Sequence, residues 1–220
     1  MPVSIFGLFY LYSMNITFWI IGITVAVSWY SFDKPALLMR LLLNPYRVAK
    51  NQEYYRLITS GLVHANFSHL LWNMFSFYFF GSVVEQYFTY FFGRNGNFYF
   101  IALYLMAIVV SDLPSYFKNR GNPRYNSLGA SGGVAAVIFA SILLQPLQLI
   151  CIYFVFCLPG FVLGTAYLIW SYYSGKKAND HINHEAHLYG ALFGLLFCAI
   201  LYPQSIPLFI DQLKDFQFSF

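Results

Sequence analysis

Charged residues are scarce in this sequence, and their scarcity excludes an ordinary soluble domain. Lys, Arg, Asp and Glu make up 9% of the 220 residues, whereas 59% are hydrophobic and 22% are aromatic. The mean hydropathy is +0.58. About a quarter of a typical soluble chain is charged, and long uncharged apolar stretches are typical of bilayer spans. We therefore predict an integral membrane protein surrounded by the lipid bilayer. The net charge of +4 is scattered without a basic block, so nucleic acid is not an expected partner.

Cysteine is scarce as well. The three cysteines, Cys151, Cys157 and Cys198, lie in apolar runs without the spacing of a metal site or a disulfide framework. We expect them to pack in the core, and we expect no metal and no cofactor. Charge is absent from residues 1–32, which also lack the basic start and the small-residue cleavage site of a removable signal peptide. This stretch is expected to be retained as the first span.

The uncharged runs predict six spans in a single all-α polytopic membrane domain, residues 1–220. Residues 125–175 contain no Asp, Glu, Lys, Arg or His, and the Gln145-Pro146 break divides them into two spans. Residues 33–67 include an apolar segment, 35–45, that is shorter than the roughly 20 residues needed to cross a bilayer. We expect this connection to form an interfacial hairpin. The predicted spans are residues 12–32, 68–92, 96–111, 130–145, 149–172 and 184–203.

Polar side chains gather at one end of the predicted bundle. Spans two, four and six enter the membrane from the same side, because the crossings alternate in direction. Their first residues bring together His64, His69 and Asn73, then Ser131, and then His187. Polar groups at membrane depth are costly, so this convergence predicts a functional site. Small residues also recur every four positions on spans four and six, a spacing that lets two membrane helices approach closely. These small residues are Gly132, Ala136 and Ala140, and Ala186, Gly190 and Gly194.

A serine beside a histidine suggests a nucleophile with its general base. If the two small-residue stripes face each other, Ser131 comes close to His187, whose imidazole can take the hydroxyl proton and return it to a leaving amine. A helix that begins at Gly-x-Ser-Gly presents free backbone N–H groups to an oxyanion, and His64 and Asn73 could donate further hydrogen bonds. Gly-x-Ser-Gly alone is not specific, and His69 could simply cap and pack its helix. The prediction of a catalytic site therefore depends on finding the serine, the histidines and the asparagine together.

These motifs resemble those of the rhomboid family of intramembrane serine proteases, in its minimal six-helix bacterial form. The matching segments are His64-x4-His69-x3-Asn73, Gly129-x-Ser131-Gly132, Ala186-His187-x2-Gly190-x3-Gly194, Glu53-Tyr-Tyr-Arg56 and Gly81-x3-Glu85. The resemblance implies a catalytic dyad of Ser131 and His187 without an acid member. It also implies an oxyanion hole formed by His64, Asn73 and the backbone N–H of Ser131. Supporting roles fall to Gly129, Gly132, His69, Gly190, Gly194, Glu85 and Arg56, and Glu85 is expected to be a buried, hydrogen-bonded acid that holds a neighbouring loop.

The resemblance also implies a class of substrate. Rhomboid proteases cut single-pass transmembrane helices that have small residues at the cut and a helix-loosening sequence nearby. Local unwinding is necessary because intact backbone hydrogen bonds bury the scissile peptide in a helix. The fifth span is the expected lateral gate, with Trp72 and Trp170 as candidate gate contacts.

One residue departs from the family pattern. Many members carry an aromatic residue four positions after the nucleophile, where it stacks on the catalytic imidazole, and this chain has Ala135 there. We expect His187 to be held in another way, with Tyr189 and Phe139 as candidates.

The loop charges conflict with the family's topology. The end that carries the predicted site holds ten Lys and Arg residues, and the other end holds two, Arg94 and Lys214. The positive-inside rule puts the ten-charge end in the cytoplasm, whereas the family puts the active site on the extracytoplasmic side. Because the first connection is long and interfacial, the prediction follows the family, in a bacterial inner membrane. The ten residues are Lys34, Arg40, Arg47, Lys50, Arg56, Lys118, Arg120, Arg124, Lys176 and Lys177.

Two other functions compete with proteolysis. His181, His184 and His187 recur every three residues around Glu185, which suggests a proton-coupled or metal-coupled transporter. Positions three apart do not stay on one helix face over six residues, however, and this weakens the transporter hypothesis. The second alternative is a non-proteolytic rhomboid-like protein that binds membrane helices. Such proteins lack the dyad, whereas both Ser131 and His187 are present here.

Overall fold

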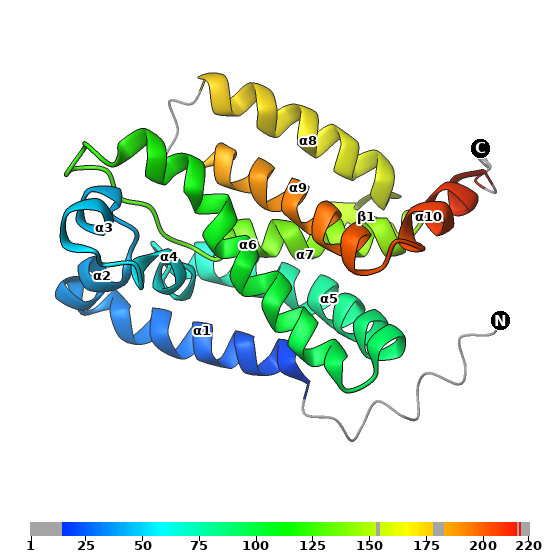
Figure 1. Ribbon diagram of the computed structural model, residues 1–220, viewed down its shortest axis with the longest axis horizontal. Helices are drawn as coiled ribbons and strands as arrows, with labels where there is room; N and C mark the ends of the chain where they lie inside the picture. Colours follow the sequence, from blue (N-terminus) through cyan, green and yellow to red (C-terminus); the bar gives the residue numbers. More distant parts are fainter. Residues whose placement is uncertain (1–14, 153–154, 178–182, 215, 217–220) are drawn as a thin grey trace.

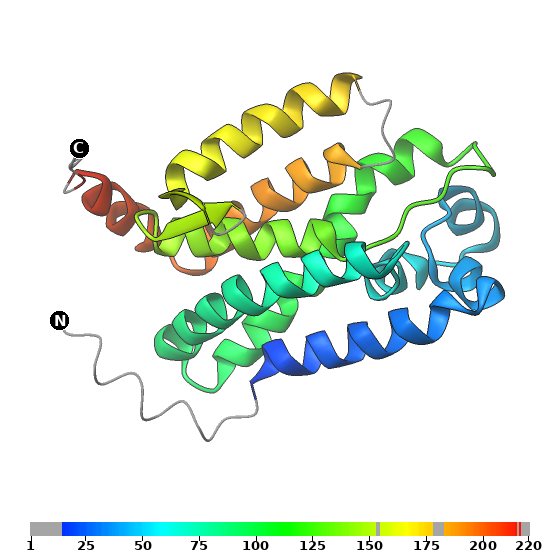
Figure 2. The ribbon, with the colours of Figure 1, turned by 180° about the vertical axis from the view of Figure 1, so that it is seen from behind.

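A computed structural model describes residues 15–152, 155–177, 183–214 and 216, and it is mostly helical. The longer helices lie side by side, with α1 and α8 at opposite edges of the molecule and α7 between them (Figures 1 and 2). The longer helices are α1 (Ile16–Phe32), α5 (Phe67–Phe92), α6 (Asn95–Asn119), α7 (Ser131–Leu144), α8 (Gly160–Lys177) and α9 (His184–Leu201). The shorter elements are α2 (Pro35–Leu41), α3 (Pro45–Asn51), α4 (Arg56–Thr59), η3 (Ser60–Leu62), β1 (Leu149–Ile152), β2 (Phe156–Pro159) and α10 (Ser205–Lys214).

The helices follow most of the predicted spans. Helices α5, α7 and α9 agree with spans two, four and six to within two residues, and α1 agrees with the described part of span one, of which residues 12–14 lie outside the described residues. Among the described residues, α6 and α9 are long and apolar enough to cross a membrane by themselves, and α1 and α7 are shorter apolar helices.

The third predicted span ends too early. Helix α6 continues beyond residue 111 to Asn119, and this continuation includes Asp112 and Pro114. Asp112 is buried, and it accepts a hydrogen bond from the Ser60 hydroxyl at 3.2 Å. The helix can therefore continue through the charged residue Asp112, because the fold supplies Ser60 as its hydrogen-bond partner.

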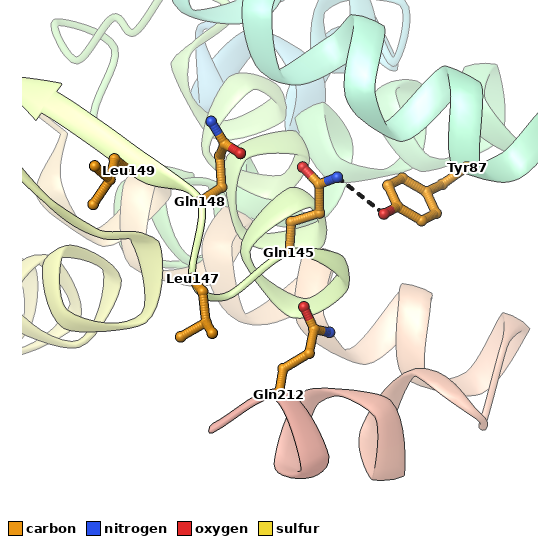
Figure 3. A pocket seen from close by; sticks show the side chains of 6 residues that line it. All are labelled: Tyr87, Gln145, Leu147, Gln148, Leu149 and Gln212. Carbon is orange, nitrogen blue, oxygen red and sulfur yellow. Dashed lines mark hydrogen bonds between the residues drawn. The ribbon is translucent and has the colours of Figure 1, made fainter. Parts of the chain in front are cut away.

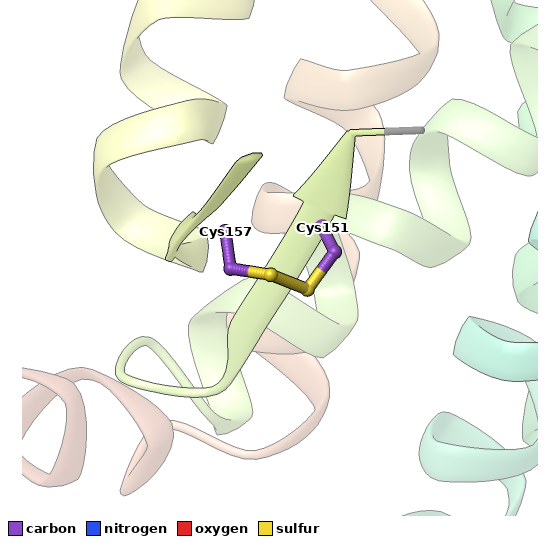
Figure 4. The surroundings of a disulfide bond; sticks show 2 residues. All are labelled: Cys151 and Cys157. Atoms are coloured by element: carbon purple, nitrogen blue, oxygen red, sulfur yellow. A yellow bond between two sulfur atoms is a disulfide. The ribbon is translucent and has the colours of Figure 1, made fainter. Parts of the chain in front are cut away.

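The fifth predicted span is wrong at its start. Residues 149–152 and 156–159 form two paired antiparallel strands in which Cys151 pairs with Cys157, and α8 begins only at Gly160. The chain is therefore not entirely α-helical. The two paired cysteines are joined by a disulfide (Figure 4), and they do not pack in the core as expected. Cys198 packs in the core as expected, where it is a buried free thiol.

Helix α7 is the centre of the bundle. All of its residues except Ser131 and Ile138 are buried, as expected for a helix that is apolar on all of its faces. A β-carbon at Gly190 would overlap the carbonyl oxygen of Gly132, and one at Gly194 would overlap that of Ala136. The small-residue stripes of α7 and α9 therefore face each other, as predicted. With a rise of about 1.5 Å per residue, α7 is only about 21 Å long, so Ser131 begins a helix too short to cross a bilayer core of about 30 Å.

The connection from α1 to α5 forms short helices around a buried arginine. Arg56 is 1% exposed, and its Nη1 donates to the carbonyl oxygens of Met39 and Leu42, each at 2.9 Å. Its Nε pairs with Glu53, and the hydrogen bond from Asn51 together with this pairing lowers the pKa of Glu53. Arg56 therefore organises this connection from inside.

Glu85 is buried in α5 and holds the first turn of α1. Its carboxylate accepts the backbone N–H groups of Ile16 and Thr17 at 2.7 and 3.0 Å, and the Thr17 hydroxyl at 2.7 Å. A carboxylate at a helix N-terminus satisfies otherwise unpaired N–H groups and opposes the positive end of the helix dipole. The acid is buried and hydrogen-bonded as expected, although it holds a helix start and not a loop.

Candidate active site

A cavity of about 1180 Å³ lies between α5 and α8, with α7 along its floor. Ser131 from α7, His187 from α9, and His69 and Asn73 from α5 all line it. Its walls are otherwise mostly apolar, with Phe80, Ile138, Phe139, Ile142, Leu163 and Tyr167 among the lining residues. The structure therefore brings four of the predicted polar residues to one cavity.

Ser131 is the first residue of α7, and a constrained loop precedes it. Gly129 has φ +116°, a left-handed conformation that favours glycine, and its N–H donates to the carbonyl oxygen of Ser60 at 2.9 Å. A β-carbon at Gly129 would also lie 2.6 Å from Cε1 of His69. Because the first N–H groups of an α-helix have no intrahelical acceptor, Ser131 presents its backbone N–H at the same point as its hydroxyl.

The contacts between α7 and α9 explain why Ser131 and His187 share the cavity. A β-carbon at Gly132 would lie 3.5 Å from the carbonyl oxygen of Ala186. Ser131 and His187 are the direct chain neighbours of these two residues. The close approach of the two helices therefore sets the serine and the histidine at the same level of the bundle.

His64 lies outside the described lining of the cavity, although the sequence pattern assigned it to the oxyanion hole. Its side chain is fully buried. The Ser28 hydroxyl donates to the carbonyl oxygen of Leu62 at 2.8 Å, so it accepts from Nδ1 of His64 at 2.9 Å. Nε2 in turn accepts the N–H of Ala130 at 3.3 Å. Burial, together with the neighbouring His69, lowers the pKa of His64 to about 3, so the ring is neutral and its single proton is already used.

His69 and Asn73 lie one helical turn apart and face the cavity together. Nδ2 of Asn73 donates to the carbonyl oxygen of His69 at 2.9 Å, and an amide carries a second N–H for another acceptor. The Asn66 side chain accepts the backbone N–H of His69 at 2.8 Å and caps α5. The helix is therefore capped by Asn66 and not by the side chain of His69, and His69 lines the cavity.

The aromatic ring beside His187 comes from α8. Tyr167 lies near-parallel to the imidazole, at 24°, with 6.5 Å between ring centroids. Ala135 of α7 is buried and has no ring of its own. Phe139, one of the expected supports, packs against Tyr167 at 5.9 Å, while Tyr189 is 44% exposed.

The two tryptophans proposed for the gate lie on opposite walls of the cavity. Trp72 belongs to α5 and Trp170 to α8, both line the cavity, and each is about half exposed, at 52% and 50%. Trp170 also meets His184 edge-on at 4.8 Å and Tyr167 at 6.0 Å. Their positions agree with an opening between α5 and α8.

Sequence reasoning missed two residues at this site. Tyr167 had no motif to mark it, because aromatic residues are abundant throughout the chain. Asp112 lines the cavity and holds Ser60, whose carbonyl oxygen fixes the N–H of Gly129. The signal that could have found Asp112 is its position directly after a long uncharged run, because an acid next to membrane depth is costly unless it has a role.

The structure describes two of the three histidines on which the transporter hypothesis depends, His184 and His187. His181 lies outside the described residues, while His184 and His187 have ring centroids 6.3 Å apart. Within the described ranges, no three His, Cys, Asp or Glu side chains are grouped so that they could hold a metal ion.

Comparison with known proteins identifies the class. Residues 51–204 match the Rhomboid domain, and the chain belongs to the rhomboid family of integral membrane proteins. It is 32% identical to the chloroplastic rhomboid-like protein 11 of Arabidopsis thaliana over 67% of this chain, and 27% identical to the mitochondrial rhomboid-like protein 12 of the same plant over 78%. The alignments cover 52% and 55% of those proteins, about half of their length. The Bacillus subtilis protein YdcA, named provisionally as a rhomboid protease, is 27% identical over 78% of this chain and 81% of its own length.

Proposed function

We propose that this protein is an intramembrane serine endopeptidase that uses Ser131 as nucleophile and His187 as general base. The observation that carries the proposal is the shared cavity, into which α7 brings a serine at a free helix N-terminus and α9 brings a histidine. The cavity walls are apolar helices, so the reaction takes place inside a membrane domain. The reaction needs no metal and no cofactor.

The chemistry is acyl transfer. His187 takes the proton of the Ser131 hydroxyl as its oxygen attacks the scissile carbonyl, and the imidazolium then returns the proton to the departing amine. Water, activated by the same imidazole, hydrolyses the acyl-enzyme and regenerates the serine. Tyr167 lies along the ring of His187 and takes the orienting place left empty by Ala135.

Asn73, His69 and the backbone N–H of Ser131 form the proposed oxyanion hole. All three residues line the cavity, and Asn73 retains one N–H beyond its bond to the His69 carbonyl. Loss of one oxyanion donor typically costs ~10²–10³ in rate. His64 is assigned a positioning role, because its two ring nitrogens tie Ser28 of α1 to the loop before Ser131.

The proposed substrates are single-pass transmembrane helices that enter between α5 and α8, past Trp72 and Trp170. A helix must unwind locally before its carbonyl can reach Ser131, which favours small or helix-loosening residues near the cut. The proposed domain is a six-span bundle over residues 1–220. A bacterial inner membrane is the proposed location, supported by the alignment along 81% of the Bacillus subtilis relative.

Cleavage of a labelled transmembrane reporter by the purified protein in detergent, with chelator present, tests the proposal. We expect the wild type to cut, and Ser131→Ala and His187→Ala to lose at least ~10³ of the rate while keeping their thermal stability. Ser141→Ala is the matched control, because Ser141 is a buried serine of the same helix outside the described cavity lining. Undiminished cleavage by purified Ser131→Ala would exclude the dyad. A folded wild type that binds a panel of helices without cutting any would favour the non-proteolytic, helix-binding alternative.

A further inference from the structure

The cavity that holds Ser131 extends along α7 to the strand pair formed by β1 and β2. Ile150 and Ile152 of β1 line this cavity together with Ser131. A β-carbon at Gly160 would lie 3.3 Å from both Ile150 and Ile142 of α7, so Ile150 lies near the level of Ile142. Ile142 follows Ser131 by eleven positions, and a rise of 1.5 Å per residue places it about 16 Å further along the bundle. The cavity therefore reaches well beyond the reacting groups.

The side chains of β1 alternate between two faces, as they do in any strand. Ile150 and Ile152 line the cavity, where Ile150 is partly exposed and Ile152 is 45% exposed. Leu149 and Cys151 belong to the other face and lie outside the described cavity lining. Leu149 instead lines a smaller pocket beside α5 and α10 (Figure 3). The strand therefore offers two apolar side chains to the cavity, and both are accessible from it.

Several connections hold the strand pair in place. The disulfide joins Cys151 of β1 to Cys157 of β2. The first two N–H groups of α8 donate to carbonyl oxygens of the turn before β1, at 2.9 and 3.0 Å. Gln145 of this turn donates to the Tyr87 hydroxyl of α5 at 2.9 Å (Figure 3). Because two short strands alone are at best marginally stable, we expect the disulfide to keep the two isoleucines at the cavity wall.

A helix that enters between α5 and α8 and reaches Ser131 also passes the strand pair, because both line one continuous cavity. A membrane helix is apolar along about 20 residues, so its side chains can cover Ile150 and Ile152. A distance of about 16 Å corresponds to about 11 residues of helix, or about 7 if three residues at the cut are unwound and extended. The contact therefore falls about 7–11 residues from the cut.

We propose that the strand pair is a second contact site for the substrate, at which Ile150 and Ile152 recognise an apolar residue about 7–11 residues from the cut. This inference rests on the proposed function, since its ligand is the transmembrane helix that Ser131 cuts. Continuity with the cavity of Ser131 favours the substrate helix over a lipid chain as the occupant. Binding energy from a remote part of a substrate then contributes to specificity at the reacting centre.

Photocrosslinking tests the contact without any cleavage. Full-length Ser131→Ala is placed in lipid nanodiscs with reporter helices that carry benzoylphenylalanine at single positions, and crosslinked peptides are identified by mass spectrometry. We expect crosslinks to Ile150 or Ile152 from positions about 7–11 residues from the cut, and not from positions next to it. Crosslinks to other cavity residues with none to β1 from any position, as expected if lipid covers the strand, would overturn the proposal.

Two neighbouring substitutions in β1 test its effect on cleavage. We expect Ile152→Gln to lower kcat/KM about tenfold for a reporter with Leu at the contact position, because a buried apolar contact is lost. The loss should be smaller for a reporter with Asn there. Leu149→Gln is the matched control and should stay within about twofold of the wild type. Equal kcat/KM for Ile152→Gln and the wild type, or an equal loss with both reporters, would refute the contact.

The two proposals fail separately. Normal cleavage by the wild type without a crosslink to β1 would refute the second contact site alone. A crosslink to β1 from a reporter that the wild type binds and does not cut would refute the proposed function alone. Fluorophosphonate labelling of Ser131 in Ile152→Gln separates binding from chemistry, and a lost adduct there would place the effect of the substitution at Ser131 and overturn its role in binding.

Reduction tests the part played by the disulfide. Dithiothreitol converts the Cys151–Cys157 disulfide to two thiols and is itself oxidised to its cyclic disulfide. We expect reduction to raise KM for the reporter several-fold with little change in kcat, because the dyad is untouched while the strand pair loosens. The Cys151→Ser, Cys157→Ser double variant should show the same KM with or without dithiothreitol. An unchanged KM after complete reduction of the wild type would show that the disulfide does not hold the contact.

Discussion

At the scale of single residues, the backbone directly before Ser131 is tightly constrained. Gly129 combines a left-handed conformation with a β-carbon position 2.6 Å from the His69 ring. We expect Gly129→Ala to lower activity by more than about tenfold, because strain of the order of 1–3 kcal/mol must be relieved by moving the loop or His69. Gly121→Ala is the control, since a β-carbon there meets nothing within 4 Å. Equal activity of the two variants would show that the loop geometry is not needed.

Asp112 is a second single residue on which the loop depends. It accepts from the Ser60 hydroxyl, and the Ser60 carbonyl oxygen accepts the N–H of Gly129. Asp112→Asn keeps an acceptor and should retain activity within a few-fold. Asp112→Leu leaves a buried hydroxyl unpaired, which costs about 1–3 kcal/mol. We expect a lower kcat for the leucine variant with little change in KM for a reporter helix, whereas equal losses in both variants would point to the charge itself.

The site residues show what spacing can and cannot predict. Ser131, His187 and Asn73 line the cavity, as the motif implied. The motif also contains two histidines five positions apart, and spacing alone does not say which ring points to the cavity. Tertiary contacts decide it, because Ser28 of α1 and Ala130 take both nitrogens of His64 and leave His69 for the cavity.

At the scale of elements, the contact of α7 with α9 fixes the distance between the two halves of the site. A β-carbon at Gly194 would overlap the Ala136 carbonyl oxygen, whereas Gly22 on α1 has open space. We expect Gly194→Val to destabilise the protein by about 1–3 kcal/mol or more, as overpacking does, and to lower its melting temperature in detergent. Gly22→Val should be close to neutral. Equal melting temperatures of the two variants would contradict this close helix contact.

The first helix depends on one buried acid. Glu85 accepts three hydrogen bonds at the start of α1, and hydrogen bonds to a charged group contribute about 1.5–3 kcal/mol each. We expect Glu85→Gln to increase hydrogen exchange in the first turns of α1. Glu185→Gln is the control, because its pair with Lys118 is exposed and such pairs contribute about 0–1 kcal/mol. Unchanged exchange in α1 of the Glu85 variant would argue against this anchoring role.

Helices and their contacts could be predicted wherever a sequence pattern fits a single type of structure. The small-residue stripes of α7 and α9 predicted their contact correctly because that spacing has little other use in a membrane helix. Residues 149–152 and 156–159 were misassigned because a continuous apolar run fits either a helix or a strand, and periodicity does not separate the two. The pairing of Cys151 with Cys157 depends on the hairpin register, so no cysteine spacing could have revealed it.

At the scale of the whole molecule, the sequence predicted the family and the convergence of Ser131, His187 and Asn73 on one cavity, whereas it did not decide the direction of insertion. Composition indicated a membrane protein, and the motifs indicated the rhomboid family, which the match over residues 51–204 confirms. The loop charges and the family's usual orientation favour opposite directions of insertion, so the sequence does not decide between them.

The central claim is that Ser131 is a nucleophile activated by His187, and covalent labelling tests it most directly. The purified protein is treated with a fluorophosphonate, which reacts with activated serines without any knowledge of the substrate, and the modified peptide is identified by mass spectrometry. The account predicts one adduct, on Ser131, which is lost in His187→Ala and retained in Ser141→Ala. A folded wild type that remains unlabelled, or labelling of Ser131 that persists unchanged in His187→Ala, would contradict it.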